Sequence, residues 1–346
     1  MRSLARYAAT NALTRTMLSE LLSRSDFDHI LRSETLDGAW LALRKTSYGD
    51  WIREDPPSDT AGAEKVLREA TAARFKRAIR SLRGAPRDVA SILLSRWDID
   101  NLEFALRLWH GRDNTLQKYL TYPTFADDIQ VHDIVEAETL EEIALILSHT
   151  PYFDPVRTSL RAYREKKSIF FVEMALERDY YARLLRAVRD IGGTDAKQAE
   201  KVIGAEIDMI NLSWLARMVD YYGIKVEQFH EYVIPGPSEV SRRLAAPGLS
   251  DQDLKDIRGD FLGRRSSEEG EGFSQLEGVA LMEGLVREMA VDAAHRSLAA
   301  YPFSIGCVFA FYLLKRLEFM NLQTVFVAKS IGPAAGDASA RLYGLR

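Results

Sequence analysis

The sequence predicts an all-α protein built from three related helical repeats. Apolar residues recur every three or four positions, as in amphipathic helices, and no stretch shows the sustained alternation of a half-buried strand. Asn-Gly or Asp-Gly turns between β-branched runs, which would indicate hairpins, are missing. The third observation is a short motif that occurs three times at a constant spacing, which indicates three repeats.

The motif is an acidic residue followed three positions later by Asn-Leu within an apolar helical pattern. Its acidic residues, Asp98, Asp208 and Glu318, are 110 positions apart in both intervals. The accompanying residues are Asn101, Leu102, Asn211, Leu212, Asn321 and Leu322. A glycine follows each Asn by ten to twelve residues, at Gly111, Gly223 and Gly332, where a helix end is expected. We therefore expect one helical unit written three times, over 1–112, 113–223 and 224–346.

The first repeat is expected to open with helices from about Asn11 to Ser23 and over 26–32. The next segment starts at Thr35 and recurs at Thr139, in both copies with a threonine at the N-cap and an acidic residue in the first turn. Six residues are identical at a uniform shift of 104 positions: Thr35, Leu36, Leu41, Leu43, Thr46 and Tyr48 match Thr139, Leu140, Leu145, Leu147, Thr150 and Tyr152. This second matched segment favours internal duplication.

The remaining elements follow from breakers and apolar spacing. Two prolines and a glycine interrupt the chain over 53–62, and a long helix from about Ala63 to Leu82 follows. The first motif helix then carries Ile92, Leu93, Leu94, Trp97, Leu102, Leu106 and Trp109. Further helices are expected from about Pro155 to Ile191, Ala196 to Tyr222 and Leu276 to Ala299, and over 312–329. Proline loops at 122–128 and 234–238 occupy matching places, and a degenerate Thr-Leu segment lies at 249–254.

Composition restricts the partners and the compartment. The net charge of -4 gives no basic field over the whole chain, which argues against nucleic acid as the principal partner. The single cysteine, Cys307, excludes an intrachain disulfide and a thiolate metal cluster, and fits a reducing, cytosolic compartment. The N-terminus lacks the pattern of a secretory signal, and the longest apolar stretch, 301–314, is shorter than the roughly 20 residues of a spanning helix. We expect no membrane span.

The motif favours a structural role over catalysis. Acid and amide three positions apart on a helix can touch each other and cap a neighbouring backbone, so we expect each Asn to be buried and bonded to a loop. The six histidines form no paired metal spacing, and no phosphate loop with Lys-Ser/Thr is present. We predict no catalytic residue, no cofactor and no metal. An alternative is Asp127-Asp128, which resembles the magnesium-diphosphate motif of helical prenyl synthases, although the second acidic motif of those enzymes is lacking.

These features together resemble a known family. The three motif helices, the Thr-x-Tyr after the leucine-rich segment and the terminal segment 312–324 resemble the C subunit of archaeal and bacterial A/V-type ATPases, the counterpart of the eukaryotic d subunit. The resemblance covers essentially the whole chain. Two positions depart from the family pattern: Arg316 stands where the family usually has Glu, and Met320 where it usually has Arg.

The resemblance implies a funnel of three helical domains about a pseudo-threefold axis, peripheral on the cytoplasmic face of the membrane. Its partners would be the membrane proteolipid (c/K) ring on one side and the central shaft, made by the D and F subunits, on the other. Such a central-stalk rotor protein has no active site and couples ATP turnover to proton or sodium transport; the ion and the direction are decided by other subunits. A rival interpretation is a cytosolic helical-repeat scaffold with another elongated partner.

Overall fold

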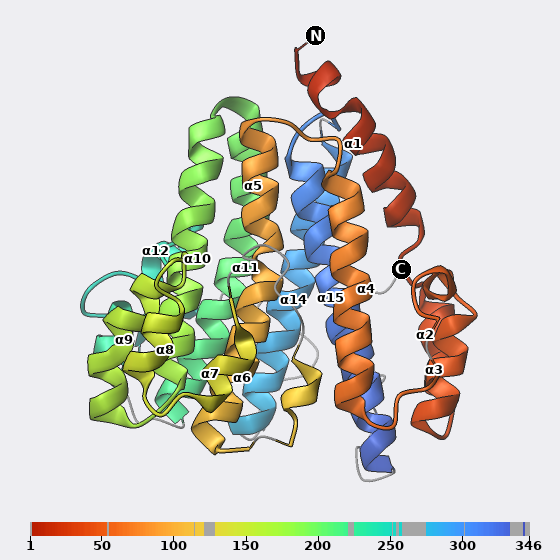
Figure 1. Ribbon diagram of the computed structural model, residues 1–346. Coiled ribbons are helices and arrows are strands. Elements are labelled where there is room, and N and C mark those ends of the chain that lie inside the picture. Colours follow the sequence, from red (N-terminus) through yellow and green to blue (C-terminus); the bar gives the residue numbers. More distant parts are fainter. Residues whose placement is uncertain are drawn as a thin grey trace. The chain divides into compact units, whose positions relative to one another are not determined.

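The structure is a computed structural model that describes residues 2–53, 55–113, 115–120, 129–220, 225–250, 252–253, 256–257, 275–300, 302–332 and 342. Within these ranges all regular structure is helical, which confirms the all-α prediction (Figure 1). None of the helices in these ranges is long and apolar enough to cross a membrane.

The chain divides into two compact units. The first contains Met1–Asn11 and Val188–Leu314, and the second contains Ala12–Ala187 and Lys315–Arg346. The boundaries fall inside three helices: α1 (Arg2–Ser19), α10 (Phe170–Ile191) and α15 (Gly306–Ile331).

The first unit is organised by two long helices, α11 (Gly193–Asp220) and α14 (Gln275–Ala299), which pack along each other. The short elements η3 (Val226–Glu231) and α12 (Glu239–Leu244) pack on α11. Small buried residues on the long helices, Ala199, Ala290 and Ala294, allow close packing. The start of α1 is anchored here, because the Tyr7 hydroxyl donates to Asp195 Oδ2 at 2.8 Å.

One core of the second unit joins the two ends of the sequence. It is formed by α2 (Arg24–Leu31), α3 (Leu36–Arg44), η1 (Ser47–Asp50), α4 (Thr60–Ile79) and the last turns of α15. Trp40 is fully buried there, with its ring centroid 6.0 Å from that of Phe326 on α15. The buried members include Phe27, Ile30, Leu43, Leu67, Phe319, Leu322 and Val325. Burial of side chains of this size stabilises by about 1.5–3 kcal/mol each.

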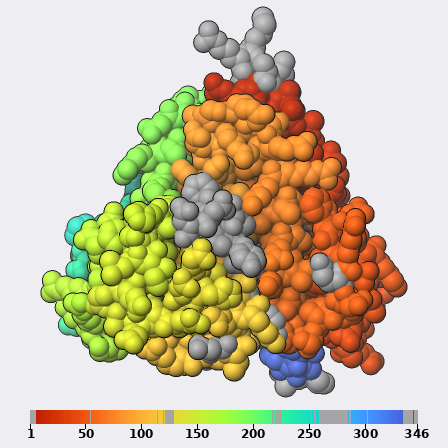
Figure 2. All heavy atoms as spheres, viewed as in Figure 1, coloured from red at the N-terminus to blue at the C-terminus, as the bar shows by residue number. Residues whose placement is uncertain are grey.

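The rest of the second unit is a series of shorter helices. These are α5 (Ala85–Leu94), α6 (Arg96–Gly111), η2 (Gln117–Tyr119), α7 (Val131–Glu136), α8 (Leu140–Ile146) and α9 (Phe153–Lys166), followed by most of α10. Helix α6 packs on α7, and α8 packs on α9. Side chains close the space between α8 and α9, which form one continuous yellow-green surface in Figure 2.

The predicted threonine caps are confirmed. Thr35 Oγ1 accepts the Gly38 N–H at 3.1 Å, and Thr139 Oγ1 accepts the Glu142 N–H at 3.2 Å. The second threonine of each segment also acts identically in the two copies. Thr46 Oγ1 accepts the Tyr48 N–H, and Thr150 Oγ1 accepts the Tyr152 N–H, each at 3.2 Å.

One local expectation is wrong. The apolar run 92–109 is interrupted, because α5 ends at Leu94 and α6 begins at Arg96. At the break, the Ser95 hydroxyl donates to Ile92 O at 2.7 Å, a local bond that competes with the helix ladder. The helix end expected at Gly111 is confirmed, because Gly111 is the last residue of α6; the left-handed residue that follows is Arg112 (φ 53°). Contacts of the Arg112 guanidinium with Ala137 O and Glu138 O hold this conformation, whereas Gly332 (φ 74°) follows α15 as expected.

Candidate functional site

The motif residues are buried. The three acids, here called the motif carboxylates, are Asp98 (1% exposed), Asp208 (7%) and Glu318 (5%). The asparagines are buried as well, as are the leucines: Asn101, Asn211, Asn321, Leu102, Leu212 and Leu322. A buried carboxylate is stable only when donors or cations surround it, so the partners of each acid define its role.

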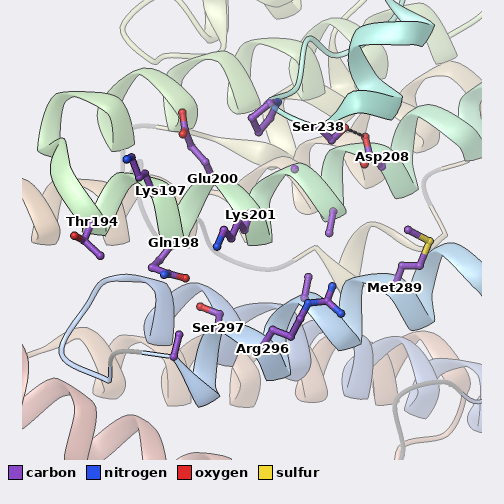
Figure 3. A pocket seen from close by; sticks show the side chains of 15 residues that line it. Thr194, Lys197, Gln198, Glu200, Lys201, Asp208, Ser238, Met289, Arg296 and Ser297 are labelled. Carbon is purple, nitrogen blue, oxygen red and sulfur yellow. Dashed lines mark hydrogen bonds between the residues drawn. The ribbon is translucent and has the colours of Figure 1, made fainter.

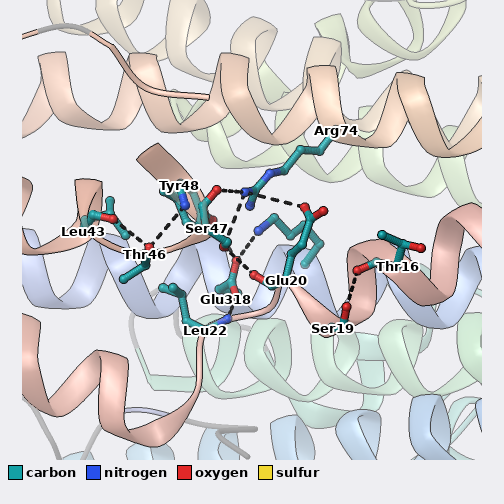
Figure 4. Close-up of polar contacts among 11 residues, drawn as sticks. Thr16, Ser19, Glu20, Leu22, Leu43, Thr46, Ser47, Tyr48, Arg74 and Glu318 are labelled. Carbon is teal, nitrogen blue, oxygen red and sulfur yellow. Dashed lines mark hydrogen bonds and ion pairs between the residues drawn. The ribbon is translucent and has the colours of Figure 1, made fainter. Parts of the chain in front are cut away.

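Glu318 is surrounded by groups from the first fifty residues (Figure 4). The Leu22 backbone N–H donates to Oε2 at 2.5 Å, and the Tyr48 hydroxyl donates to Oε1 at 2.7 Å. On its own helix, the Lys315 ammonium forms an ion pair with Oε1. The carboxylate therefore joins the last helix of the chain to residues more than 250 positions earlier.

The cations beside Glu318 are also buried. The Lys315 Nζ atom lies 4.3 Å from the centroid of the Tyr48 ring, and the Arg74 guanidinium lies 4.4 Å from the same centroid. Burial lowers the pKa of Lys315 to about 8, although the charge of Glu318 opposes the shift. Burial and the charge of Glu318 raise the pKa of Tyr48 well above its usual value. The hydroxyl thus remains a donor at physiological pH.

Asp208 and Asn211 hold the loop between η3 and α12 in the first unit. The hydroxyls of Ser238 and Ser241 both donate to Asp208 Oδ1 at 2.5 Å. Asn211 makes a reciprocal pair with one backbone residue: its Nδ2 donates to Ile234 O at 2.9 Å, and its Oδ1 accepts the Ile234 N–H at 2.8 Å. Burial raises the pKa of Asp208, and the serine hydroxyls oppose that shift.

Glycine is required where this loop approaches α11. A Cβ on Gly236 would lie 2.5 Å from Ser241 Oγ and 3.0 Å from Ile207 Cγ2, distances that carbon atoms do not reach without displacement of neighbours. The prolines of this loop indicated it in the sequence. The absence of a side chain at Gly236 lets the loop lie close to Ser241 and to Ile207 on α11.

Asp98 lies beside the second copy of the Thr-x-Tyr segment. Burial raises the pKa of the Tyr152 hydroxyl, and the charge of Asp98 is the next cause. Tyr152 and Tyr48 are equivalent in the duplicated segment, but the Tyr152 hydroxyl forms no hydrogen bond with Asp98, whereas the Tyr48 hydroxyl donates to Glu318. The charge of a motif carboxylate therefore raises the pKa of the equivalent tyrosine in both copies, but a hydrogen bond joins tyrosine and carboxylate only in the first.

Two further residues, which the sequence did not indicate, anchor the ends of neighbouring helices. Trp109 Nε1 donates to Ala137 O at 2.8 Å, just after the end of α7, and Lys329 Nζ donates to Leu31 O at 2.5 Å, at the end of α2. Each lies 11 positions after its motif carboxylate, so they are 220 positions apart, like Asp98 and Glu318. The interval was a usable signal, but Trp and Lys differ too much to be matched by identity.

Arg316 on α15 has a defined partner. Its NH2 atom lies 3.6 Å from Asp100 Oδ1, and Arg96 NH2 lies 2.6 Å from the same oxygen. Burial raises the pKa of Asp100, but Arg96 and Arg316 outweigh it and hold that pKa at about 2. Nearby, burial and the charge of Glu177 raise the pKa of Glu103. Met320 is half-buried.

These contacts are structural in kind. The motif carboxylates accept bonds from, or lie against, groups of the protein itself, which fix loops and chain ends. Among the described residues, no three His, Cys, Asp or Glu side chains gather as ligands for a metal ion. Asp127 and Asp128 of the prenyl synthase alternative lie outside the described residues, as do Gly223, 122–128 and part of 249–254. His132 and Asp133, which follow these two acids in the sequence, belong to α7.

Comparison with known proteins gives one consistent result. Residues 10–335 match the family described as ATP synthase (C/AC39) subunit. The C subunit of the A-type ATP synthase of Pyrococcus horikoshii is 24% identical over 322 residues, which are 92% of this chain and 85% of that protein. The corresponding C subunits from Methanosphaera stadtmanae and Methanocaldococcus jannaschii are 21% and 22% identical, over 93% and 94% of this chain and 84% and 83% of theirs.

Proposed function

Because the chain belongs to the ATP synthase (C/AC39) subunit family, we propose that it is the central-stalk socket between the shaft and the membrane ring of a rotary ATPase. Members of the family are structural subunits of A/V-type ATPases without catalytic activity of their own. The proposed partners are the D and F subunits of the central shaft and the proteolipid (c/K) ring, on the cytoplasmic face of the membrane. The observation that carries the proposal is the family match over almost the whole chain.

The contacts of the motif residues suit a part that transmits torque. A connector in series must keep its helices and loops in place under load. Buried hydrogen bonds have directional geometry and resist sliding better than apolar contacts alone. In the second unit, Glu318 ties the last helix to Leu22 and Tyr48. In the first unit, Asn211 fixes the loop at Ile234. We propose that in each of the repeats 1–112, 113–223 and 224–346 the motif helix fixes neighbouring helices or loops in this way.

The test is to reconstitute the complex with and without this chain. A missing series connector should separate ATP hydrolysis from ion transport, so we expect retained hydrolysis and lost flux. ATPase activity and ion flux should be followed in the same vesicles, with a proton-sensitive dye and with radiolabelled sodium. Adding the purified chain back should restore flux, and adding an unrelated helical protein should not. Undiminished flux in the complex without the chain would refute the proposal.

A further inference from the structure

A groove of about 660 Å³ lies between α11 and α14 in the first unit (Figure 3). Its lining on α11 runs from Thr194 to Asp208, which corresponds to about 21 Å of helix. It is continued along α14 and at Ala300, just after the end of that helix, and is closed at one end by Pro237 and Ser238. The motif contacts account for the end at Asp208, but for nothing in the rest of the groove.

The part of the groove near the start of α11 is positively charged. Lys197 and Lys201 project from α11, and Arg296 projects from α14, all three exposed. None of the three forms an ion pair or hydrogen bond with any residue that the structure describes. The neighbouring Glu200 is engaged, since the Arg189 guanidinium donates to it at 2.9 Å. The N-terminus of α11 adds its own preference for negative charge.

A buried hydroxyl also faces this groove without a partner. Ser297 on α14 is 3% exposed, and within the described part of the chain its Oγ has no hydrogen-bond partner. Figure 3 shows it on the side of α14 that faces α11, between Gln198 and Arg296. A buried hydroxyl left unpaired costs about 1–3 kcal/mol. Such a group next to three unpaired cations indicates a ligand that accepts hydrogen bonds.

We propose that this groove binds an acidic polypeptide segment of another subunit of the complex. The groove is much longer than a single phosphate group, and the cations lie on two helices instead of converging at one point. Beyond Lys201 the lining becomes small and apolar, with Gly204, Ala205 and Ala293, and can take an apolar side chain. The segment would place carboxylates on Lys197, Lys201 and Arg296 and an apolar residue beside Ala205. The proposal rests on the proposed function, because it assumes assembly with other subunits.

The test uses the full chain in the purified complex. A photo-crosslinking amino acid in place of Ala205 should form a cross-link to one partner segment that contains Asp or Glu. Lys201→Glu combined with Arg296→Glu should lower the cross-link yield at least tenfold, and added salt should weaken it, because the contact is between exposed charges. Lys225→Glu is the matched control, an exposed lysine of the same unit outside the groove. Reversal of the partner's acidic residues to Lys should restore the yield.

Several results would overturn this inference. One is a cross-link to a segment without acidic residues, or no cross-link at all. Another is a yield that is indifferent to the two charge reversals. A third is protection of the groove by inorganic phosphate at millimolar concentration, which would indicate a small-anion site instead. Failure here is distinguishable from failure of the proposed function: if the chain is needed for flux but the charge reversals change nothing, only the groove is wrong.

Discussion

Substitution of Glu318 by alanine is expected to lower the free energy of unfolding by about 3–5 kcal/mol. The side chain accepts bonds from Leu22 and Tyr48 and pairs with Lys315, which is itself 2% exposed. Loss of one partner of a buried ion pair leaves the other charge uncompensated, and that situation costs about this much. The two lost hydrogen-bond acceptors act in the same direction.

A double-mutant cycle isolates the ion pair from the other contacts. Glu318→Gln keeps the size of the side chain and removes its charge, and Lys315→Met removes the opposite charge. With both charges gone no uncompensated charge remains, so the double variant should lose less than the sum of the single losses, by about 0.5–3 kcal/mol. Urea unfolding of the purified chain, followed by tryptophan fluorescence, provides the free energies.

The matched control is the exposed pair Arg161 and Glu165, whose side chains are 88% and 56% exposed. Glu165→Gln should change the free energy of unfolding by no more than about 0.5 kcal/mol. Strict additivity of Glu318→Gln and Lys315→Met would refute the reasoning, since independent sites add.

The same pair predicts a pH dependence. The pKa of Lys315 is lowered by burial to about 8, whereas an unfolded lysine titrates near about 10.4. Between these values the unfolded chain binds the proton and the folded chain does not, so this contribution to stability increases as the pH rises. Below pH 8 the cost of burying the charge is fully present. Relative to Lys315→Met, the wild type should therefore gain in urea midpoint from about pH 7.5 to about pH 9.5; equal slopes would contradict this.

Three further predictions follow from the other buried contacts. Asn211→Ala should lower the free energy of unfolding by about 1–3 kcal/mol, because both backbone groups of Ile234 lose their partner; an unchanged urea midpoint would exclude the role assigned to this amide. Gly236→Ala should cost about 1–3 kcal/mol through the clash of its Cβ, whereas Gly111→Ala, with nothing within 4 Å, should be neutral or slightly stabilising in the same denaturant assay. Glu103→Gln should raise the melting temperature at neutral pH and lose that advantage in acid, because the raised pKa of Glu103 means that its charged form is disfavoured in the folded chain; a lower melting temperature at neutral pH would oppose this.

Much of the helical structure could be predicted from local signals. Apolar spacing defined the long helices: the ends of α11 and α14 were predicted to within three residues, whereas α15 begins at Gly306, six residues before the expected start. The caps at Thr35 and Thr139 were predictable, because a threonine followed by an acidic residue in the first helical turn is typical of an N-cap. The two copies of this segment also agree beyond the N-cap. Thr46 and Thr150 accept the same backbone hydrogen bond, from the residue two positions later.

The partners of the motif carboxylates could not be predicted, because they depend on contacts between distant parts of the chain. Nothing local indicates that Glu318 accepts a bond from Leu22, 296 positions earlier. Single polar atoms also decide details that periodicity does not reveal. The hydroxyl of Ser95 bonds to Ile92 O at the break between α5 and α6, and the guanidinium of Arg112 supports a left-handed residue that is not a glycine.

Arg316 on α15 contributes to the charge balance around Asp100 on α6. A carboxylate at 316 would lie near Asp100 and would oppose the charge of that acid. An arginine there adds a second cation beside Asp100 and helps to hold the pKa of that acid at about 2. Arg316 therefore strengthens a contact between α15 and α6 inside the second unit. Glu318, two residues further on, makes its bonds to Leu22 and Tyr48, so α15 is held to the earlier helices at both positions.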